Sequence, residues 1–190
     1  MQIDNRIIDD LIIESAKQGN EISLWVATNS MAPLIVAGDR IIVQSIKEGA
    51  RFRIGDIVLF RVNGELFLVH RIIGHRSIEG VRHVRQKGDA SIGSHFLPVD
   101  SIVGSVRLLK KQNRTIDLTT KTWRLLNLII GLVVGYIDLV AHIYRYAVRL
   151  LPVPGVLITF ARLVKRGIDR LLQRGIKALL GKNSVHKQAN

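Results

Sequence analysis

The sequence predicts a mainly β protein, with a coiled antiparallel sheet or small barrel flanked by an N-terminal helix and a C-terminal pair of amphipathic helices. Short β-branched segments separated by Gly-containing turns recur from residue 21 to residue 109, a pattern typical of a curled antiparallel sheet. Apolar residues recur at helical spacing before and after this stretch. We therefore expect an N-terminal helix (1–20), a β domain (21–112) and a basic helical region (113–190).

The first expected element is an amphipathic helix over residues 4–18. Apolar residues recur at helical spacing on one face of this helix: Ile7, Ile8, Leu11, Ile12 and Ala16. Three acidic residues lie on the opposite face: Asp9, Asp10 and Glu14. Gly19 is suited to end the helix. The opening residues lack the pattern of a secretory signal, and we expect this helix to cap one end of the sheet.

The β domain is expected to contain several short strands. The candidates are residues 22–27, 40–43, 56–62, 66–73, 83–86 and 101–106. The third and fourth candidates are separated by Asn63-Gly64, a dipeptide that favours a tight hairpin turn. We therefore expect these two strands to pair in antiparallel fashion.

Two helices are expected beyond the β domain. The first covers residues 123–149, and its polar residues fall within an arc of about 60° at helical spacing; they are Arg124, Asn127, Asp138, His142, Arg145 and Arg149. Residues 152–155, Pro-Val-Pro-Gly, are expected to end it. The second helix covers residues 156–180, with a broad basic face opposite an apolar face.

Charge is distributed unevenly along the chain. Residues 1–106 contain 12 Lys/Arg and 12 Asp/Glu, whereas residues 107–190 contain 16 and 3. The whole basic excess of +13 therefore belongs to the second part, which predicts an anionic partner such as nucleic acid or anionic lipid. The chain has no cysteine, which excludes disulfides, a thiol nucleophile and thiolate metal sites.

The expected C-terminal helices favour membrane lipid as that partner, bound through residues 122–180. Residues 125–144 are long enough to cross a bilayer, but Asp138 and His142 would then have to be paired or hidden. A helix lying in the membrane interface needs no such pairing. Trp123 and the three tyrosines of this region suit headgroup-level anchors. A spanning helix, two surface helices and a helical hairpin packed on protein all stay open.

Three residues suited to peptide hydrolysis occur in order: Ser30, His70 and Asp89. A serine hydroxyl becomes a nucleophile when a base removes its proton, and the pKa of histidine suits that task near neutral pH. A carboxylate that accepts a hydrogen bond from the histidine ring fixes its tautomer. Each residue also has an ordinary structural explanation as a turn former or packed strand residue. The functional interpretation depends on their occurring together.

The order of these motifs resembles the signal peptidase I family and the wider clan that it shares with self-cleaving SOS-type repressors. The resemblance covers residues 20–106 and rests on these segments: Ser30-Met31-x-Pro33, 38–43 (Gly-Asp-Arg-Ile-Ile-Val), 55–60 (Gly-Asp-Ile-Val-Leu-Phe), 69–72 (Val-His-Arg-Ile) and 87–89 (Lys-Gly-Asp). It implies a coiled, mostly antiparallel β fold. It also implies a peptide or pre-protein as substrate, no cofactor and no metal.

The resemblance implies a role for each matching residue. Ser30 corresponds to the nucleophile and His70 to the general base, where bacterial housekeeping enzymes have lysine, so the chain is similar to the Ser-His branch. Asp89 is the best candidate to orient His70. The Ser30 N–H and the Thr28 hydroxyl correspond to the oxyanion hole. Met31 and Pro33 follow the nucleophile and correspond to substrate-binding positions.

The chain also departs from the family pattern. Ala90-Ser91 replaces the usual Asn-Asn, and Asp100 is the next carboxylate, either a turn residue or a second candidate to orient His70. The N-terminal membrane anchor of bacterial signal peptidases is expected to be absent, its place taken by the helix over residues 4–18. Specialised leader peptides are therefore possible substrates.

The sequence thus predicts a serine endopeptidase at the cytoplasmic membrane that cleaves signal or leader peptides. The alternatives are a DNA-binding or regulatory relative of the SOS-type repressors, and a non-catalytic binding module on the same fold. No helix-turn-helix pattern precedes the β domain, and the basic helices are apolar on their far faces. For these reasons nucleic acid is not expected as a partner.

Overall fold

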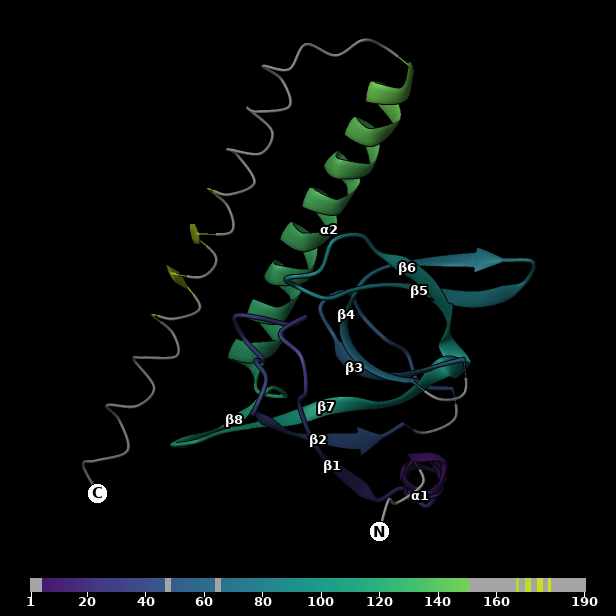
Figure 1. Ribbon diagram of the computed structural model, residues 1–190, viewed down its shortest axis with the longest axis vertical. Helices are drawn as coiled ribbons and strands as arrows, with labels where there is room; N and C mark the ends of the chain where they lie inside the picture. The colour runs from purple at the N-terminus through teal and green to yellow at the C-terminus, as the bar shows by residue number, and fades with distance from the viewer. Residues whose placement is uncertain are drawn as a thin grey trace. The chain divides into compact units, whose positions relative to one another are not determined.

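The computed structural model describes residues 5–46, 49–63 and 66–150, together with residues 167, 170, 171, 174, 175 and 178. The chain divides into two compact units, Met1–Val134 and Gly135–Asn190. Figure 1 shows the elements in order: α1 (Asn5–Lys17), β1 (Glu21–Trp25), β2 (Arg40–Ser45), β3 (Ile57–Val62), β4 (Leu66–Ile78), β5 (Val81–Lys87), β6 (His95–Pro98), η1 (Val99–Ser101), β7 (Ile102–Lys111), β8 (Arg114–Asp117) and α2 (Lys121–Leu150).

The strands form a single curled sheet in the described part of the chain. Its order is β1-β2-β7-β3-β4-β5-β6, with β8 added beside β7, and every pairing is antiparallel. The sheet curls into a half-barrel (Figure 1). The mainly β fold class predicted from the sequence is therefore confirmed, as is the hairpin in which β3 and β4 pair from Val62↔Leu66 onward.

The interior of the half-barrel is apolar. Its central cluster consists of Val58, Phe60, Ile72, Val84 and Ile102, all at most 5% exposed. β-Branched and aromatic side chains suit a pleated, half-buried surface, which explains why these segments form strands. The sheet bends where the pairing of β4 with β5 shifts between Ile72 and Gly74, because a bulge increases local twist.

Two short strands were not expected from the sequence. Strand β6 occupies an edge of the sheet and ends at Pro98, a residue that edge positions tolerate. Strand β8 pairs only with the end of β7. Each has only four residues, which is too short to produce a periodic pattern in the sequence. Strand β4 also continues to Ile78, beyond the predicted end at residue 73.

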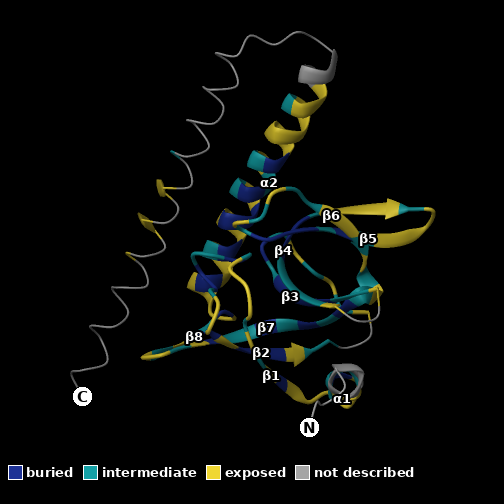
Figure 2. Ribbon diagram, viewed as in Figure 1, coloured by how far each residue is buried: buried dark blue, intermediate teal, exposed yellow. Residues whose placement is uncertain are grey.

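The helices largely follow the prediction. Helix α1 contacts β1, β2 and β7, although its Leu11 is 65% exposed. Helix α2 covers the predicted 123–149 range, and buried residues recur along its first half (Figure 2). The second predicted helix, residues 156–180, lies almost entirely outside the described residues. The division at residues 20 and 112 stays a prediction.

Candidate active site

Residues 26–39 form a closed loop that joins β1 to β2. Its ends are tied by two backbone hydrogen bonds: the Val26 N–H donates to the Asp39 carbonyl at 2.8 Å, and the Gly38 N–H donates to the Val26 carbonyl at 2.9 Å. The interior of the loop is anchored by buried apolar side chains, Met31, Leu34 and Ile35. This anchoring holds the serine loop at one end of the sheet.

Ser30 lies at the start of the turn inside this loop and is half-buried. Its Oγ accepts a hydrogen bond from the Thr28 hydroxyl at 3.4 Å. The structure therefore places together the two residues predicted to form the oxyanion hole. Met31 is buried beneath the loop, 2% exposed, and the half-buried Pro33 follows a cis peptide bond.

His70 lies on β4 opposite Val58 of β3, so its side chain faces the same side of the sheet as that core residue. The Nδ1 atom of His70 is hydrogen-bonded to Oε1 of Gln86 on β5. Because an amide oxygen only accepts, Nδ1 carries the proton and Nε2 keeps a lone pair. This is the tautomer that a general base requires.

The environment of His70 keeps its ring neutral. Burial lowers the pKa of His70 below its ordinary value, because a charged imidazolium loses hydration inside the protein. The hydrogen bond to Gln86 and the charge of Asp89 act in the opposite direction, but burial is the larger cause. Neutral imidazole is therefore the dominant form at neutral pH.

Ser30 and His70 converge on Gly88, in the loop that follows β5. A side chain at Gly88 would bring its Cβ within 2.6 Å of the Ser30 carbonyl oxygen and 2.9 Å of the His70 Nε2 atom. The Ala90 N–H also donates to that carbonyl at 2.8 Å. In the described part of the chain, no hydrogen bond joins the Ser30 Oγ directly to His70. Hydrogen bonds between a nucleophile and its general base often tighten only when substrate binds.

Asp89 lies beside this site but is bonded elsewhere. Both of its oxygens accept hydrogen bonds from Arg71, at 2.8 Å from Nε and 2.7 Å from Nη2, which makes a bidentate ion pair. Gln86, rather than Asp89, thus contacts the Nδ1 atom of His70. Asp89 acts on the His70 ring through its charge.

Comparisons with known proteins place this geometry in a family context. Residues 3–79 match the family model described as Peptidase S24-like. The chain is also 33% identical over 93 residues to the signal peptidase complex catalytic subunit sec11 of Dictyostelium discoideum, covering 43% of this chain and 51% of that relative. The chain is a signal peptidase I-like protein related to the S24 peptidases. It spans about half the length of the curated relative that it matches.

The candidate site includes two residues to which the sequence motifs gave no role, Gln86 and Arg71. Side chains alternate along a strand, and Gln86 pairs across the sheet with Ile72, on the same face as His70. Arg71 instead faces the other side of the sheet together with Lys87, its cross-strand partner. Alternation along β4 and β5 would have been the signal for both residues.

Two further residues, Asp100 and the Lys87 of the Lys-Gly-Asp motif, lie in a short turn and at the end of β5. Asp100 is exposed in the η1 turn. Lys87 is buried, and its Nζ donates to the carbonyls of Ser91 and Gly93, which holds the loop after β5 closed. No group of three or more His, Cys, Asp or Glu side chains suited to a metal occurs among the described residues.

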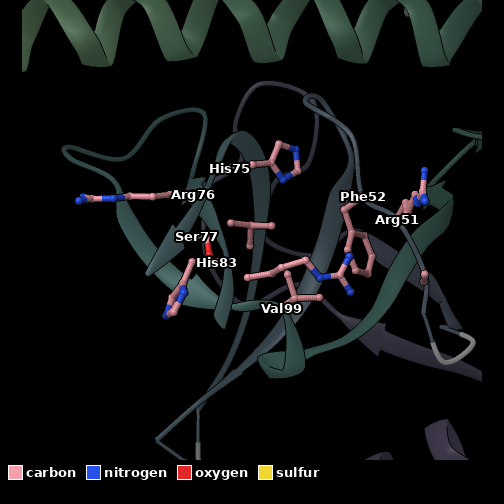
Figure 3. A pocket seen from close by; sticks show the side chains of 10 residues that line it. Arg51, Phe52, His75, Arg76, Ser77, His83 and Val99 are labelled. Carbon is pink, nitrogen blue, oxygen red and sulfur yellow. The ribbon is translucent and has the colours of Figure 1, made fainter. Parts of the chain in front are cut away.

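A separate pocket of about 450 Å³ lies toward the far end of the β4–β5 hairpin. It is lined by Ala50, Arg51, Phe52, His75, Arg76, Ser77, Arg82, His83, Val84 and Val99. Figure 3 shows Arg76 pointing away from the other labelled side chains. Neither Ser30 nor His70 lines this pocket, and its lining includes no acidic residue. This pocket is therefore separate from the candidate site around Gly88.

Proposed function

We propose that this protein is a membrane-associated serine endopeptidase that removes signal or leader segments from peptides or pre-proteins. One observation carries the proposal: Gly88 lies against both the Ser30 carbonyl and the Nε2 atom of a neutral histidine. A serine and a base on separate strands and loops have a common contact only if the fold brings them to one place. The relation to a catalytic subunit of a signal peptidase complex also supports this proposal.

In the first half of the proposed reaction, the Nε2 lone pair of His70 accepts the proton of the Ser30 hydroxyl. The Oγ atom attacks the scissile carbonyl carbon and a tetrahedral intermediate forms. As the intermediate collapses, the imidazolium gives its proton to the leaving amine and the C–N bond breaks. The peptide that is released carries the new amino terminus, and the leader segment stays bound to Ser30 as an ester.

In the second half, water replaces the amine. The neutral His70 accepts a proton from water, the hydroxide attacks the ester carbonyl, and the second intermediate collapses to a free carboxylate. The proton returns from His70 to the Ser30 oxygen. Each half begins with neutral imidazole, and burial of the ring favours that form.

Other side chains prepare this reaction. Gln86 holds the His70 tautomer, and the carboxylate of Asp89 stabilises the transient imidazolium through its charge. The Ser30 N–H and the Thr28 hydroxyl donate to the developing oxyanion. The Thr28 hydroxyl lies within hydrogen-bonding distance of the Ser30 Oγ, next to the atom that attacks the carbonyl.

The proposed substrate is an extended peptide segment with small residues near the cleaved bond. An extended peptide makes main-chain hydrogen bonds to a sheet edge or loop, and its side chains enter alternate pockets. Met31 and Pro33 lie on the serine loop next to the nucleophile. The half-buried Pro33 is proposed to contact the substrate backbone directly, whereas the buried Met31 supports the serine loop from beneath.

Helix α2 supports membrane association. The stretch Lys121–Tyr146 is long and apolar enough to cross a membrane, by length and composition. Large apolar side chains are exposed along it, including Leu125, Leu128, Ile129 and Leu132. Exposed apolar surface of this extent favours contact with lipid, and the cytoplasmic membrane is the proposed location.

The chemistry is tested by labelling Ser30. The full-length protein in vesicles is treated with a fluorophosphonate, and peptide mass spectrometry locates the adduct. We expect the label on Ser30, and we expect a His70→Ala variant to react at least about 100-fold more slowly, since a positioned base contributes about 10²–10⁴-fold. A Ser30→Ala variant that labels as strongly as the wild type would contradict the proposal.

The membrane partner is tested separately by co-sedimentation. The full-length protein is expected to pellet with vesicles that contain anionic lipid and to resist extraction with high salt, because apolar burial is insensitive to screening. Salt-sensitive binding to duplex DNA without vesicle binding would instead favour the regulatory alternative.

A further inference from the structure

A fully buried cation lies directly behind the proposed active site. Arg71 is 0% exposed and follows His70 in the chain. Its guanidinium donates to both oxygens of Asp89, to the Gly55 carbonyl at 2.9 Å and to Oδ1 of Asn127 at 2.9 Å. A buried charge needs such partners to offset its lost hydration. Arg71 thus joins the loop after β5 to the turn before β3 and to helix α2.

The helix reaches Arg71 through an unusually close approach of two backbones. A Cβ atom at Gly131 would lie 2.8 Å from the Gly55 Cα, and a Cβ at Gly55 would lie 2.5 Å from the Asn127 carbonyl oxygen. Only glycine fits at these two positions. Apolar side chains on the same stripe of the helix are buried as well, namely Trp123, Ile130 and Val134. This packing determines how far Asn127 reaches toward Arg71.

Asn127 is an exception on that stripe, because it is polar and only 7% exposed. Asparagine is a poor helix former, and burying an amide without a partner is costly. The bond from Asn127 Oδ1 to Arg71 offsets that cost. An apolar residue would serve packing alone equally well, so the amide points to a role that depends on Arg71.

We propose that Asn127 of α2 is a positioning residue for the Ser30–His70 site and acts through Arg71 and Asp89. The catalytic part of this inference rests on the proposed function. Asn127 and Gly55 hold one end of the guanidinium, and the other end holds both oxygens of Asp89. Helix α2 is then part of the catalytic unit as well as the candidate membrane helix.

The loop held in this way contacts both proposed catalytic residues. Gly88, which precedes Asp89, lies against the His70 ring. Ala90, which follows Asp89, donates its N–H to the Ser30 carbonyl. A shift of Asp89 therefore moves both neighbours, and a displacement of about 1 Å at a catalytic site can cost about 100-fold in rate.

The same shift changes the environment of His70. The groups that act on its ring are Gln86 through a hydrogen bond, and Asp89, Lys87 and His95 through charge. Burial is the largest influence and lowers the pKa of His70. A loosened loop admits water to the ring, which raises the pKa of His70, and moves the Asp89 charge away, which lowers it. Because burial is the larger influence, we expect the pKa of His70 to rise toward its ordinary value.

The test uses two substitutions at one position in the full-length protein. Asn127→Leu removes the acceptor at similar size, whereas Asn127→Asp keeps an oxygen facing Arg71. For Asn127→Leu we expect kcat to fall about 10- to 100-fold with KM changed less than about threefold, and the His70 Cε1–H NMR titration to move to higher pH. Asn127→Asp is expected within about threefold of the wild type. Equal defects in both variants would overturn the role of the acceptor.

A second pair of variants keeps the inference testable if Asn127→Leu does not fold. Gly131→Ala keeps the Asn127 side chain but pushes helix α2 away from the Gly55 backbone, whereas Gly167→Ala meets nothing within 4 Å. We expect Gly131→Ala to shift the His70 titration in the same direction and Gly167→Ala to leave it unchanged. Identical titrations in these two variants and the wild type would overturn the inference.

The two readouts separate this inference from the proposed function. The NMR titration needs no substrate, so a shifted titration in a protein that cleaves no peptide supports the coupling while the peptidase proposal fails. Conversely, cleavage that depends on Ser30 but is unchanged by Asn127→Leu, with an unchanged His70 titration, overturns the coupling and leaves the peptidase proposal standing.

Discussion

Strand β4 contains two histidines in opposite environments. His70, before the bulge at Ile72–Gly74, is bonded to Gln86 and its pKa is lowered by burial. His75, after the bulge, is exposed at a pocket whose charged lining is entirely arginine, Arg51, Arg76 and Arg82. The comparison shows that burial, an orienting partner and a nearby serine define a candidate base. A histidine that only lines a pocket, such as His75, is not by that fact a candidate base.

The largest expected effect tests this comparison directly. His70→Ala is expected to reduce kcat/KM for a leader peptide by at least about 100-fold, because the serine loses its base. His75→Ala is expected to leave it within about twofold. Initial rates of peptide cleavage, measured with circular dichroism as a check on folding, decide between them. A larger loss of kcat/KM in His75→Ala than in His70→Ala would indicate that catalysis takes place at the pocket beside His75.

Two glycines near the histidines provide the next test. The Cβ of Gly88→Ala would collide with the Ser30 carbonyl and the His70 ring, whereas that of Gly74→Ala would make an ordinary 3.6 Å contact with the Arg85 Cβ. We expect Gly88→Ala to lower kcat about 10- to 100-fold and Gly74→Ala to change it little. Comparable rates for the two variants would show that the loop after β5 does not touch the reacting groups.

Substitutions at Gln86 alter the orienting partner of His70. Gln86→Leu removes the hydrogen bond that raises the pKa of His70, so the pKa should fall further. Gln86→Glu places a carboxylate there and should raise it. The NMR titration is expected to order the pKa as Leu, then wild type, then Glu. Activity should fall about tenfold in Gln86→Leu because the tautomer is no longer held. An unchanged titration in both variants would remove Gln86 from the site.

The smallest effect is expected at the exposed end of the hairpin. Arg76 and Arg85 both lie over the Phe96 ring, at 5.9 and 5.7 Å from its centroid. Arg76→Ala should therefore lower the unfolding free energy by at most about 1 kcal/mol and leave cleavage unchanged. Urea denaturation measures the first quantity. A large loss of activity would mean that this end of the molecule takes part in catalysis.

Much of the fold was predictable because its signals are local. The β-branched composition of the segments that form β2, β3 and β4 predicts strands there. The Asn63-Gly64 dipeptide predicts the hairpin between β3 and β4. Strands β6 and β8 are stabilised by pairing with the longer strands β5 and β7. Their sequences alone therefore did not predict them.

The site was predictable only in part. Ser30 and His70 are candidates that short motifs identify, but the contact of Gln86 with His70 depends on the register of β5 against β4. Asn127 was assigned to a polar stripe of the helix from its spacing. The structure instead buries it against Arg71, a tertiary contact that no local pattern encodes.

The central claim is that neutral His70 is the base that activates Ser30. The most direct measurement compares the pH dependence of kcat/KM for leader-peptide cleavage with the NMR titration of His70 in the same full-length protein. We expect both to report one apparent pKa below the ordinary histidine value of about 6.5. Activity that appears only above about pH 8, while His70 titrates at lower pH, would indicate a lysine base and contradict the account.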